Sequence, residues 1–184
     1  GRILQVVARS EKGGYALSDS GEVYSWGVGE HGANGDGSTS LNSQAARVLG
    51  LPEGDPVVQV YAREHAGGYA LTRSGQVYSW GAGARGANGN SSADDAWQAQ
   101  RVHLPSDVQA KQVIVRETEG AFALATDGRV FAWGQGDLGQ NGNDSTADAL
   151  TPVQVQFEGG QPTVTKLVTR HGPWGRKAGG AYAM

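Results

Sequence analysis

The sequence contains three full copies of one motif and the beginning of a fourth copy. Trp26, Trp80 and Trp133 mark the same position in successive copies, so the copies lie about 54 residues apart, and self-similarity at a fixed period indicates a repeat array. Each full copy consists of three matching segments: residues 13–17, 21–27 and 32–35 in the first copy, 67–71, 75–81 and 86–89 in the second, and 120–124, 128–134 and 139–142 in the third. The fourth copy contains only the first segment, at 180–184. In such arrays each unit buries its apolar face against the next. The fold prediction therefore concerns one repeat and its contact with a neighbour.

Each repeat offers four short β-type runs separated by turn residues. The first is continuously apolar, as expected for a strand covered on both faces, and covers 3–8, 57–62, 112–115 and 164–169. A second run, such as 15–17, leads through Ser20-Gly21 into a third, such as 23–26, and glycine supplies the positive φ of a tight hairpin. The fourth and least regular run is expected over 47–49, 101–104 and 152–155. Four antiparallel strands per repeat are typical of one propeller blade.

The repeats resemble those of the regulator of chromosome condensation family. The resemblance rests on the Ala-Leu strand, the Ser or Asp before glycine, the Val-Tyr-x-Trp-Gly strand and the closing glycine turn, and it covers the whole chain. It implies an all-β fold, a β-propeller that in the family has seven blades. Two positions depart from the family pattern: Asn34, Asn88 and Asn141 replace its usual leucine, and Arg9, Arg63, Arg116 and Arg170 lie near its usual histidine.

We therefore expect about three and a half four-stranded blades, an open segment of a larger or assembled propeller. Residues 1–184 form one propeller segment, with approximate repeats at 3–56, 57–110 and 111–163 and a partial repeat at 164–184. Three and a half blades cannot close a ring, and open apolar sheet faces and edges promote association. Other chains, or the rest of a longer chain, are expected to complete it.

Composition excludes several function classes. The formal net charge of −3 argues against nucleic acid as the partner, and no apolar run approaches the roughly 20 residues of a membrane helix. The chain starts at Gly1 without a charged and apolar leader, so any targeting segment was removed or never included. With no cysteine, and with His31, His65, His103 and His171 not at metal-ligand spacing, we expect no metal site.

No catalytic or cofactor-binding residue is predicted. Residues 27–32, 81–86 and 134–139 match the dinucleotide fingerprint Gly-x-Gly-x-x-Gly, but a phosphate site needs a following helix and these runs lead into loops. We interpret them as turns. The acidic loops around Asp36, Asp94, Asp95, Asp144 and Asp148 lack the spacing of a calcium loop and are expected to serve turns and the solvent-facing surface.

Two side chains recur with the repeat. Trp26, Trp80 and Trp133 are expected to fill the space between adjacent sheets. The repeated arginines are expected to form an arc. It is either structural, through ion pairs with Glu11, Glu64 and Glu117, or a ring that binds anions.

The variable loops carry the partner-binding candidates. An insertion in the fourth repeat contains aromatic and basic residues of the kind that dominate interfaces, and corresponding loops elsewhere vary in sequence. The candidates are His171, Trp174, Arg176, Lys177, Glu30, His31 and Arg85. We predict a non-enzymatic recognition module that binds a protein or glycan through propeller-face loops, from a bacterial surface or secreted protein, with a cytoplasmic location left open. The alternatives are a guanine-nucleotide-exchange or chromatin-associated regulator, as the resemblance implies, and a structural or assembly domain.

Overall fold

The computed structural model describes residues 1–64, 66–116, 119–169 and 181–183, and it contains three four-stranded antiparallel sheets and a strand pair. Blade 1 consists of β1 (Ile3–Ala8), β2 (Gly13–Ser18), β3 (Val23–Gly27) and β4 (Asn42–Arg47). Blade 2 consists of β5 (Val57–Arg63), β6 (Gly67–Thr72), β7 (Val77–Gly81) and β8 (Ala96–Arg101). Blade 3 consists of β9 (Ala110–Val115), β10 (Gly120–Ala125), β11 (Val130–Gly134) and β12 (Ala149–Gln154), and β13 (Leu167–Thr169) pairs with β14 (Ala181–Ala183).

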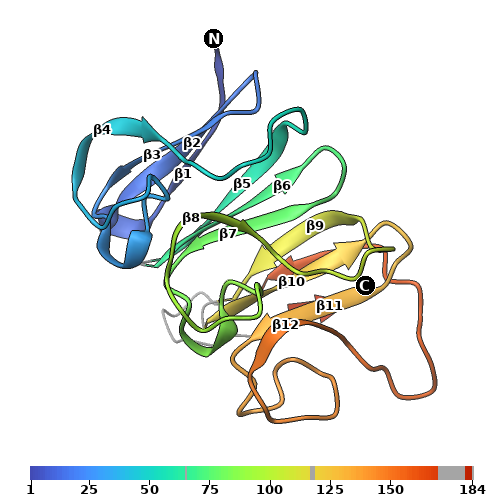
Figure 1. Ribbon diagram of the computed structural model, residues 1–184. Coiled ribbons are helices and arrows are strands. Elements are labelled where there is room, and N and C mark those ends of the chain that lie inside the picture. The colour runs from blue at the N-terminus through green and yellow to red at the C-terminus, as the bar shows by residue number, and fades with distance from the viewer. Residues whose placement is uncertain (65, 117–118, 170–180, 184) are drawn as a thin grey trace.

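The blades follow one another side by side in chain order (Figure 1). Within each blade the strands are hydrogen-bonded in sequence order, and the first strands β1, β5, β9 and β13 adjoin one another. This arrangement confirms the predicted all-β propeller segment. None of the helices within the described residues is long and apolar enough to cross a membrane.

Glycine turns close the hairpins as predicted. Gly21 has φ +84°, and its carbonyl accepts a hydrogen bond from Val57 at the start of the next blade. The fingerprint-like runs form turns as well: the first two contain the 3-10 helices η2 (Glu30–Gly32) and η3 (Ala84–Gly86), each a single turn. A third short helix, η1 (Ser10–Lys12), links β1 to β2.

The predicted position of the fourth strand is wrong in the first two blades, where the structure places it at Asn42–Arg47 and Ala96–Arg101, before the apolar runs at 47–49 and 101–104 that suggested it. In blade 3 the strand covers Ala149–Gln154 and overlaps most of the predicted run at 152–155. The outermost strand has one side toward solvent, so it needs no continuous apolar run; β4 reads Asn-Ser-Gln-Ala-Ala-Arg. The apolar Val48 follows the strand and donates its N–H to the carbonyl of Val23.

The core lies between neighbouring blades. Trp80 is fully buried; its ring meets Tyr15 of blade 1 edge-on with centroids 5.2 Å apart, and its Nε1 donates to the Tyr15 hydroxyl at 3.2 Å. The Trp133 ring meets Tyr69 of blade 2 edge-on with centroids 5.8 Å apart, and its Nε1 donates to the carbonyl of Ala87 at 3.2 Å. The predicted packing role is confirmed for Trp80 and Trp133, whereas Trp26 is only half-buried.

Burial of the interface tyrosine predicts alkaline sensitivity. Desolvation raises the pKa of Tyr15 from 10.0 to about 12, although the nearby Arg9 opposes the shift. The protonated phenol is favoured in the folded state, so its contribution is complete below about pH 10 and is lost as the pH rises through about 12. We expect the free energy of unfolding to fall across this range by up to about 1.4 kcal/mol per pH unit from this group. Urea unfolding at several pH values measures this decrease. For Tyr15→Phe the free energy of unfolding should fall less steeply with pH, and an equal slope for the variant and the original protein would contradict the assignment of the effect to Tyr15.

The antiparallel order gives the segment two ends. We call the loop face the end that holds the β1–β2 and β3–β4 connections, residues 9–12 and 28–41 in blade 1, and their equivalents. The turn face is the opposite end, with the β2–β3 turn at 19–22 and the β4–β5 connection at 48–56.

Candidate functional site

The repeated arginines lie inside the loop face. Arg63 extends over the Tyr69 ring with its guanidinium carbon 5.3 Å from the centroid, and it donates to the carbonyls of Ala82 and Trp80 at 2.8 and 2.6 Å. Its Nη2 also donates to Asn88 Oδ1 at 3.0 Å. The Asn88 amide in turn donates to the carbonyl of Gly81 at 3.1 Å. The side chains of Arg63 and Asn88 therefore join the end of β5, the end of β7 and the following loop.

Blade 1 repeats this unit. Arg9 is fully buried and donates to Asn34 Oδ1 at 2.8 Å and to the carbonyls of Trp26 and Val28 at 2.9 and 3.1 Å. The two departures from the family pattern, arginine for histidine and asparagine for leucine, thus meet in one buried hydrogen-bonded pair in each of the first two blades. In blade 3, Arg116 donates instead to the carbonyls of Glu119, Trp133 and Gln135.

Of the two alternatives for these arginines, the structural one agrees with the contacts of Arg9, Arg63 and Arg116, but in the described part of the chain their hydrogen bonds reach groups other than carboxylates. Arg9, Arg63 and Arg116 are buried, and their hydrogen bonds within the described residues go to carbonyl oxygens and to asparagine side chains, while Glu117 lies outside those residues. Burial lowers the pKa of Arg116 to about 10, as expected when a cation loses water, although the charge of Asp148 opposes the shift. These groups are structural, and Arg170 lies outside the described residues.

Two loop-face candidates connect adjacent blades. His31 Nδ1 lies 2.8 Å from Asp95 Oδ2 of blade 2, and Arg85 contacts Asp148 of blade 3 through Nε at 2.9 Å and Nη2 at 3.0 Å. Arg85 also pairs with Asp137 at 3.1 Å. These ion pairs raise the pKa of Arg85 and lower that of Asp148. The side chains reach solvent, but each already has an interblade partner.

Of the remaining partner-binding candidates, one lies within the described residues and four lie outside them. Glu30 is exposed and lies 3.5 Å from Lys12 Nζ. His171, Trp174, Arg176 and Lys177 fall outside the described residues, so their binding role stays a prediction. Among the histidines within the described ranges, His103 contacts Ser91 Oγ at 2.8 Å. Over the same ranges, no three acidic or histidine side chains gather as a metal site would need.

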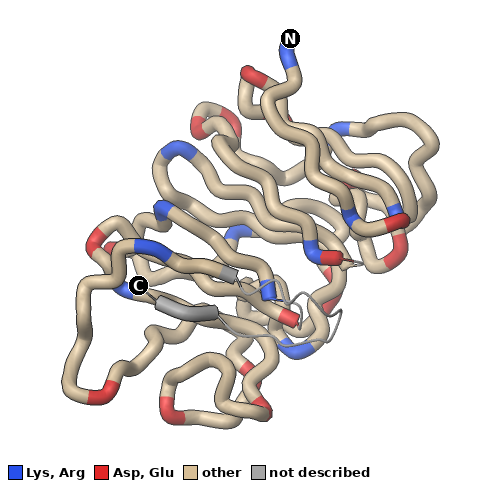
Figure 2. Tube along the Cα trace, turned by 180° about the vertical axis from the view of Figure 1, so that it is seen from behind, with Lys and Arg blue, Asp and Glu red and all other residues tan. Residues whose placement is uncertain are grey.

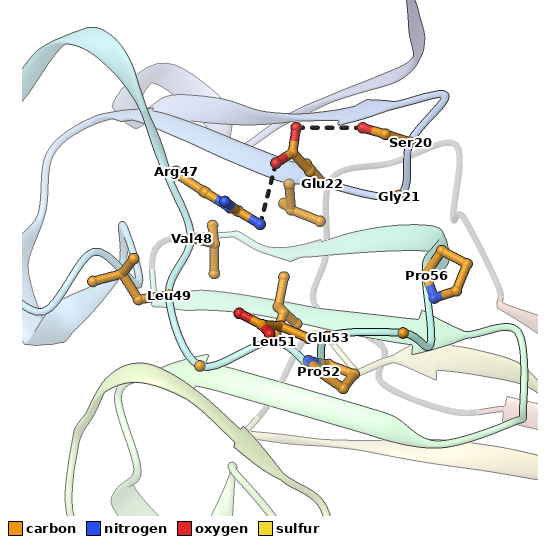
Figure 3. Close-up of a pocket in the computed structure, with 13 residues that line it drawn as sticks. Ser20, Gly21, Glu22, Arg47, Val48, Leu49, Leu51, Pro52, Glu53 and Pro56 are labelled. Carbon is orange, nitrogen blue, oxygen red and sulfur yellow. Dashed lines mark hydrogen bonds and ion pairs between the residues drawn. The ribbon is translucent and has the colours of Figure 1, made fainter. Parts of the chain in front are cut away.

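The turn face carries a pocket that the sequence analysis did not predict. It has a volume of about 660 Å³ and lies between the β2–β3 turn of blade 1 and the β4–β5 connection. Figure 3 shows Ser20, Glu22 and Arg47 along one side and Leu51, Pro52 and Glu53 along the other. Val23 and Val48 are buried at its base, while Leu49 remains 41% exposed. The pocket offers an accessible apolar surface with charged groups at its rim.

Hydrogen bonds hold one side of this pocket in place. Glu22 accepts from Arg47 Nη2 at 3.1 Å through Oε1, and from Ser20 Oγ at 3.3 Å and the Tyr24 hydroxyl at 3.0 Å through Oε2. The bond to Glu22 raises the pKa of Tyr24. Glu53 on the other side is exposed. Glu22 is thus engaged, and Glu53 is the carboxylate that faces solvent.

The sequence contained one signal for this pocket. The connection that lines it, 48–56, reads Val-Leu-Gly-Leu-Pro-Glu-Gly-Asp-Pro and differs from the equivalents at 102–109 and 155–163, while the strands around it hardly change. Its first two residues, Val48 and Leu49, belong to the run predicted as the fourth strand, and the structure buries Val48 but leaves Leu49 accessible.

Charge is mixed over the described residues. Figure 2 shows Lys and Arg interspersed with Asp and Glu around the strand ends. The chain as a whole has 15 basic and 18 acidic residues. Nothing in this distribution makes one face a match for a phosphate backbone.

Comparison with known proteins agrees with the blade architecture. A family model described as the regulator of chromosome condensation (RCC1) repeat matches residues 127–169. The E3 ubiquitin-protein ligase HERC2 of Homo sapiens is 30% identical over 160 residues, and the ultraviolet-B receptor UVR8 of Arabidopsis thaliana is 29% identical over 161 residues. The chain belongs to the RCC1 repeat family. Human WBSCR16 shares the fold with a TM-score of 0.75 and 23% identity, and Prp20p of Saccharomyces cerevisiae with a TM-score of 0.72 and 20% identity.

This RCC1 repeat segment spans only part of these proteins. The matches cover 84% of the chain but 3% of HERC2, and 86% of the chain but 36% of UVR8. The structural matches cover 91% of the chain and 43% of WBSCR16, and 85% of the chain and 39% of Prp20p. The shared property is the repeat and its fold.

Proposed function

We propose that this RCC1 repeat segment is a non-enzymatic module that binds a protein partner, and that the turn-face pocket receives an apolar segment of that partner. The observation that carries the proposal is the 660 Å³ pocket, which Leu49, Leu51 and Pro52 line and at which Leu49 is 41% exposed. Concave apolar sites with a few polar groups at the rim are the usual form of binding sites.

The rim favours a basic residue in the bound segment. Arg47 is neutralised by Glu22, whereas Glu53 is exposed at the opposite side. A lysine or arginine next to an apolar anchor would therefore face a carboxylate. Relatives support the class of partner: Prp20p is described by its binding to Gsp1p and histones, and another structure holds yeast RCC1 bound to Kap60.

A displayed peptide library selected on the immobilised chain tests this proposal. We expect enrichment of peptides that combine a large apolar residue with Lys or Arg. Leu49→Asp should weaken their binding at least about tenfold, because a carboxylate would be placed in the apolar pocket. Leu150→Asp is the matched control, since Leu150 is also 41% exposed but lies on blade 3. Glu53→Lys should shift the selection toward acidic peptides. Equal losses for Leu49→Asp and Leu150→Asp would reject the pocket as the site.

The finer predictions from the sequence stay proposals. They are glycan binding, a bacterial surface or secreted protein, and an extracellular location with a cytoplasmic one left open. A glycan array probed with the same variants tests the first. The exchange-factor alternative predicts faster nucleotide release from a small GTPase, and the assembly alternative predicts that no peptide is selected.

A further inference from the structure

Trp97 is an exposed tryptophan at the seam between blades 1 and 2. We call the seam the place on the loop face where the tip turn of blade 1, residues 30–33, meets the start of β8. Trp97 is 53% exposed, yet a Cβ at Gly32 would lie only 2.9 Å from its Cδ1, so the indole lies directly against the tip turn. The Trp97 carbonyl accepts a hydrogen bond from the Gly37 N–H at 2.9 Å. Blade 1 therefore fixes the start of this strand, while much of the side chain stays open to solvent.

The fold does not require a tryptophan at this position. The second residue of the outer strand is Ser43 in blade 1 and Leu150 in blade 3. Leu150 packs on the tip turn of blade 2 as Trp97 packs on that of blade 1, since a Cβ at Gly86 would lie 2.9 Å from Leu150 Cδ2. Leucine thus suffices for the packing. An accessible tryptophan is instead typical of the residues that concentrate binding energy at interfaces.

The two seams also differ in the charge beside this residue. At the seam of blades 2 and 3, Arg85 contacts Asp148 through Nε at 2.9 Å and Nη2 at 3.0 Å. At the seam of blades 1 and 2 the tip residue is His31, whose Nδ1 lies 2.8 Å from Asp95 Oδ2. A histidine loses its charge as the pH rises through the neutral range, whereas an arginine keeps it. Above neutral pH, Asp95 therefore retains a net negative charge two residues before Trp97.

The Asp95 carboxylate has room for a further hydrogen-bond donor. Its Oδ1 accepts from the Gly83 N–H at 3.0 Å, and its Oδ2 contacts His31. An ionised carboxylate offers about four lone-pair sites, so about two remain beside these contacts. The Asp95 side chain is 34% exposed, so a donor from solvent or from a partner can reach it.

The loops between the third and fourth strands add further negative charge to the loop face. Loops 28–41, 82–95 and 135–148 contain a single Lys or Arg, which is Arg85, and it already contacts Asp148. An excess of one charge sign favours a partner of the opposite sign. These loops therefore complement a cationic segment. Their acidic residues are Glu30, Asp36, Asp94, Asp95, Asp137, Asp144 and Asp148.

We propose that Trp97 and Asp95 form a binding site for an arginine side chain of a protein partner, with the guanidinium stacked on the indole and hydrogen-bonded to the carboxylate. Tryptophan is the aromatic side chain that attracts cations most strongly, and a planar guanidinium can stack on a ring while it donates to a carboxylate. The site includes none of the residues that line the turn-face pocket, so it does not depend on the function proposed for that pocket.

The test uses a pentapeptide probe, Gly-Arg-Gly-Arg-Gly, with both ends blocked. Its matched control carries citrulline, an uncharged analogue of similar shape, in place of each arginine. At about pH 8, where histidine is uncharged, we expect the arginine peptide to shift the Trp97 indole N–H signal in NMR spectra of the whole chain. The citrulline peptide should leave the signal unmoved. Loss of the signal in Trp97→Leu assigns it, and leucine is the residue that blade 3 carries at this place.

Fluorescence polarisation of the labelled arginine peptide then measures the contribution of each group. Trp97→Leu and Asp95→Asn should each raise the Kd about twofold to fivefold, the range for an exposed cation–π contact or ion pair. His31→Arg should also weaken binding, because it places a permanent cation against Asp95 as Arg85 does against Asp148. Glu158→Gln is the matched control, since it removes an exposed carboxylate after blade 3, and it should leave the Kd unchanged.

Three results would overturn the proposal. Equal shifts with the arginine and citrulline peptides would show that the ligand is not recognised by its charge. An unmoved Trp97 signal, whether or not the peptide binds elsewhere, would remove the site. A Trp97 shift with methyl α-glucoside but not with the arginine peptide would assign the indole to a glycan instead. The comparison of the two peptides uses the unchanged chain, so it decides the case even if a substituted chain fails to fold.

Discussion

Replacing Trp80 by alanine is expected to destabilise the chain by about 3–5 kcal/mol, the range for removing a buried tryptophan. The ring is fully buried between blades 1 and 2, edge-on to Tyr15 and against the φ-positive Gly35, whose position would place a Cβ only 2.9 Å from Trp80 Cδ1. Two sheets held apart by their own hydrogen-bonded strands cannot collapse far into the cavity. The Tyr15 hydroxyl also loses its donor.

Urea unfolding followed by circular dichroism measures this loss without relying on tryptophan emission. Trp97→Ala is the matched control, since Trp97 is an exposed tryptophan on the outer strand β8, and we expect it to cost far less. Trp26→Ala should fall between the two, because the Trp26 side chain in blade 1 is half-buried. A loss below about 1 kcal/mol for Trp80→Ala would mean that the interface repacks and that the ring is not its main support.

The fold could be predicted from the sequence wherever the repeat fixes a residue type. Glycine before the third strand and tryptophan at its end each require one backbone shape or one buried volume, so Gly21 and Trp80 were assigned correctly. The fourth strand was misplaced in blades 1 and 2 because an outer strand has no apolar pattern of its own and the apolar residues nearby, such as Val48, belong to the connection after it.

The candidate sites were harder to predict, for reasons that differ between the two faces. The hydrogen-bond partners of the arginines are mostly backbone carbonyls. Because every residue has a backbone carbonyl, no sequence pattern predicts which ones the arginines bind. Acidic residues close in sequence to Arg63 suggested ion pairs, but the chain direction takes the side chain inward over Tyr69. The pocket depends on how far the β4–β5 connection stands away from the β2–β3 turn, a distance between segments that no local pattern encodes.

The pairing of Arg63 with Asn88 leads to the second large effect. Arg63→Met keeps most of the apolar stem over Tyr69 but removes the donors to the carbonyls of Trp80 and Ala82 and to Asn88 Oδ1. A buried acceptor left without a donor costs about 1–3 kcal/mol, so we expect a loss of about 3–4 kcal/mol in the free energy of unfolding. Asn88→Leu, which restores the usual residue of the family, should cost about 2 kcal/mol on its own because the guanidinium then loses an acceptor.

The double substitution separates this explanation from a charge effect. If the two departures from the family pattern act as one unit, Arg63→Met with Asn88→Leu should cost less than the sum of the single changes by at least about 1 kcal/mol. Arg63→Lys should be nearly as harmful as Arg63→Met, because one ammonium cannot reach acceptors spread along a planar guanidinium, whereas a site built on charge alone would tolerate lysine. Arg73→Met, at an exposed arginine of the same blade, is the control and should leave stability unchanged within error. Additive single effects together with a tolerated lysine would show that Arg63 acts through its charge, and that the asparagine in the turn serves its own loop independently.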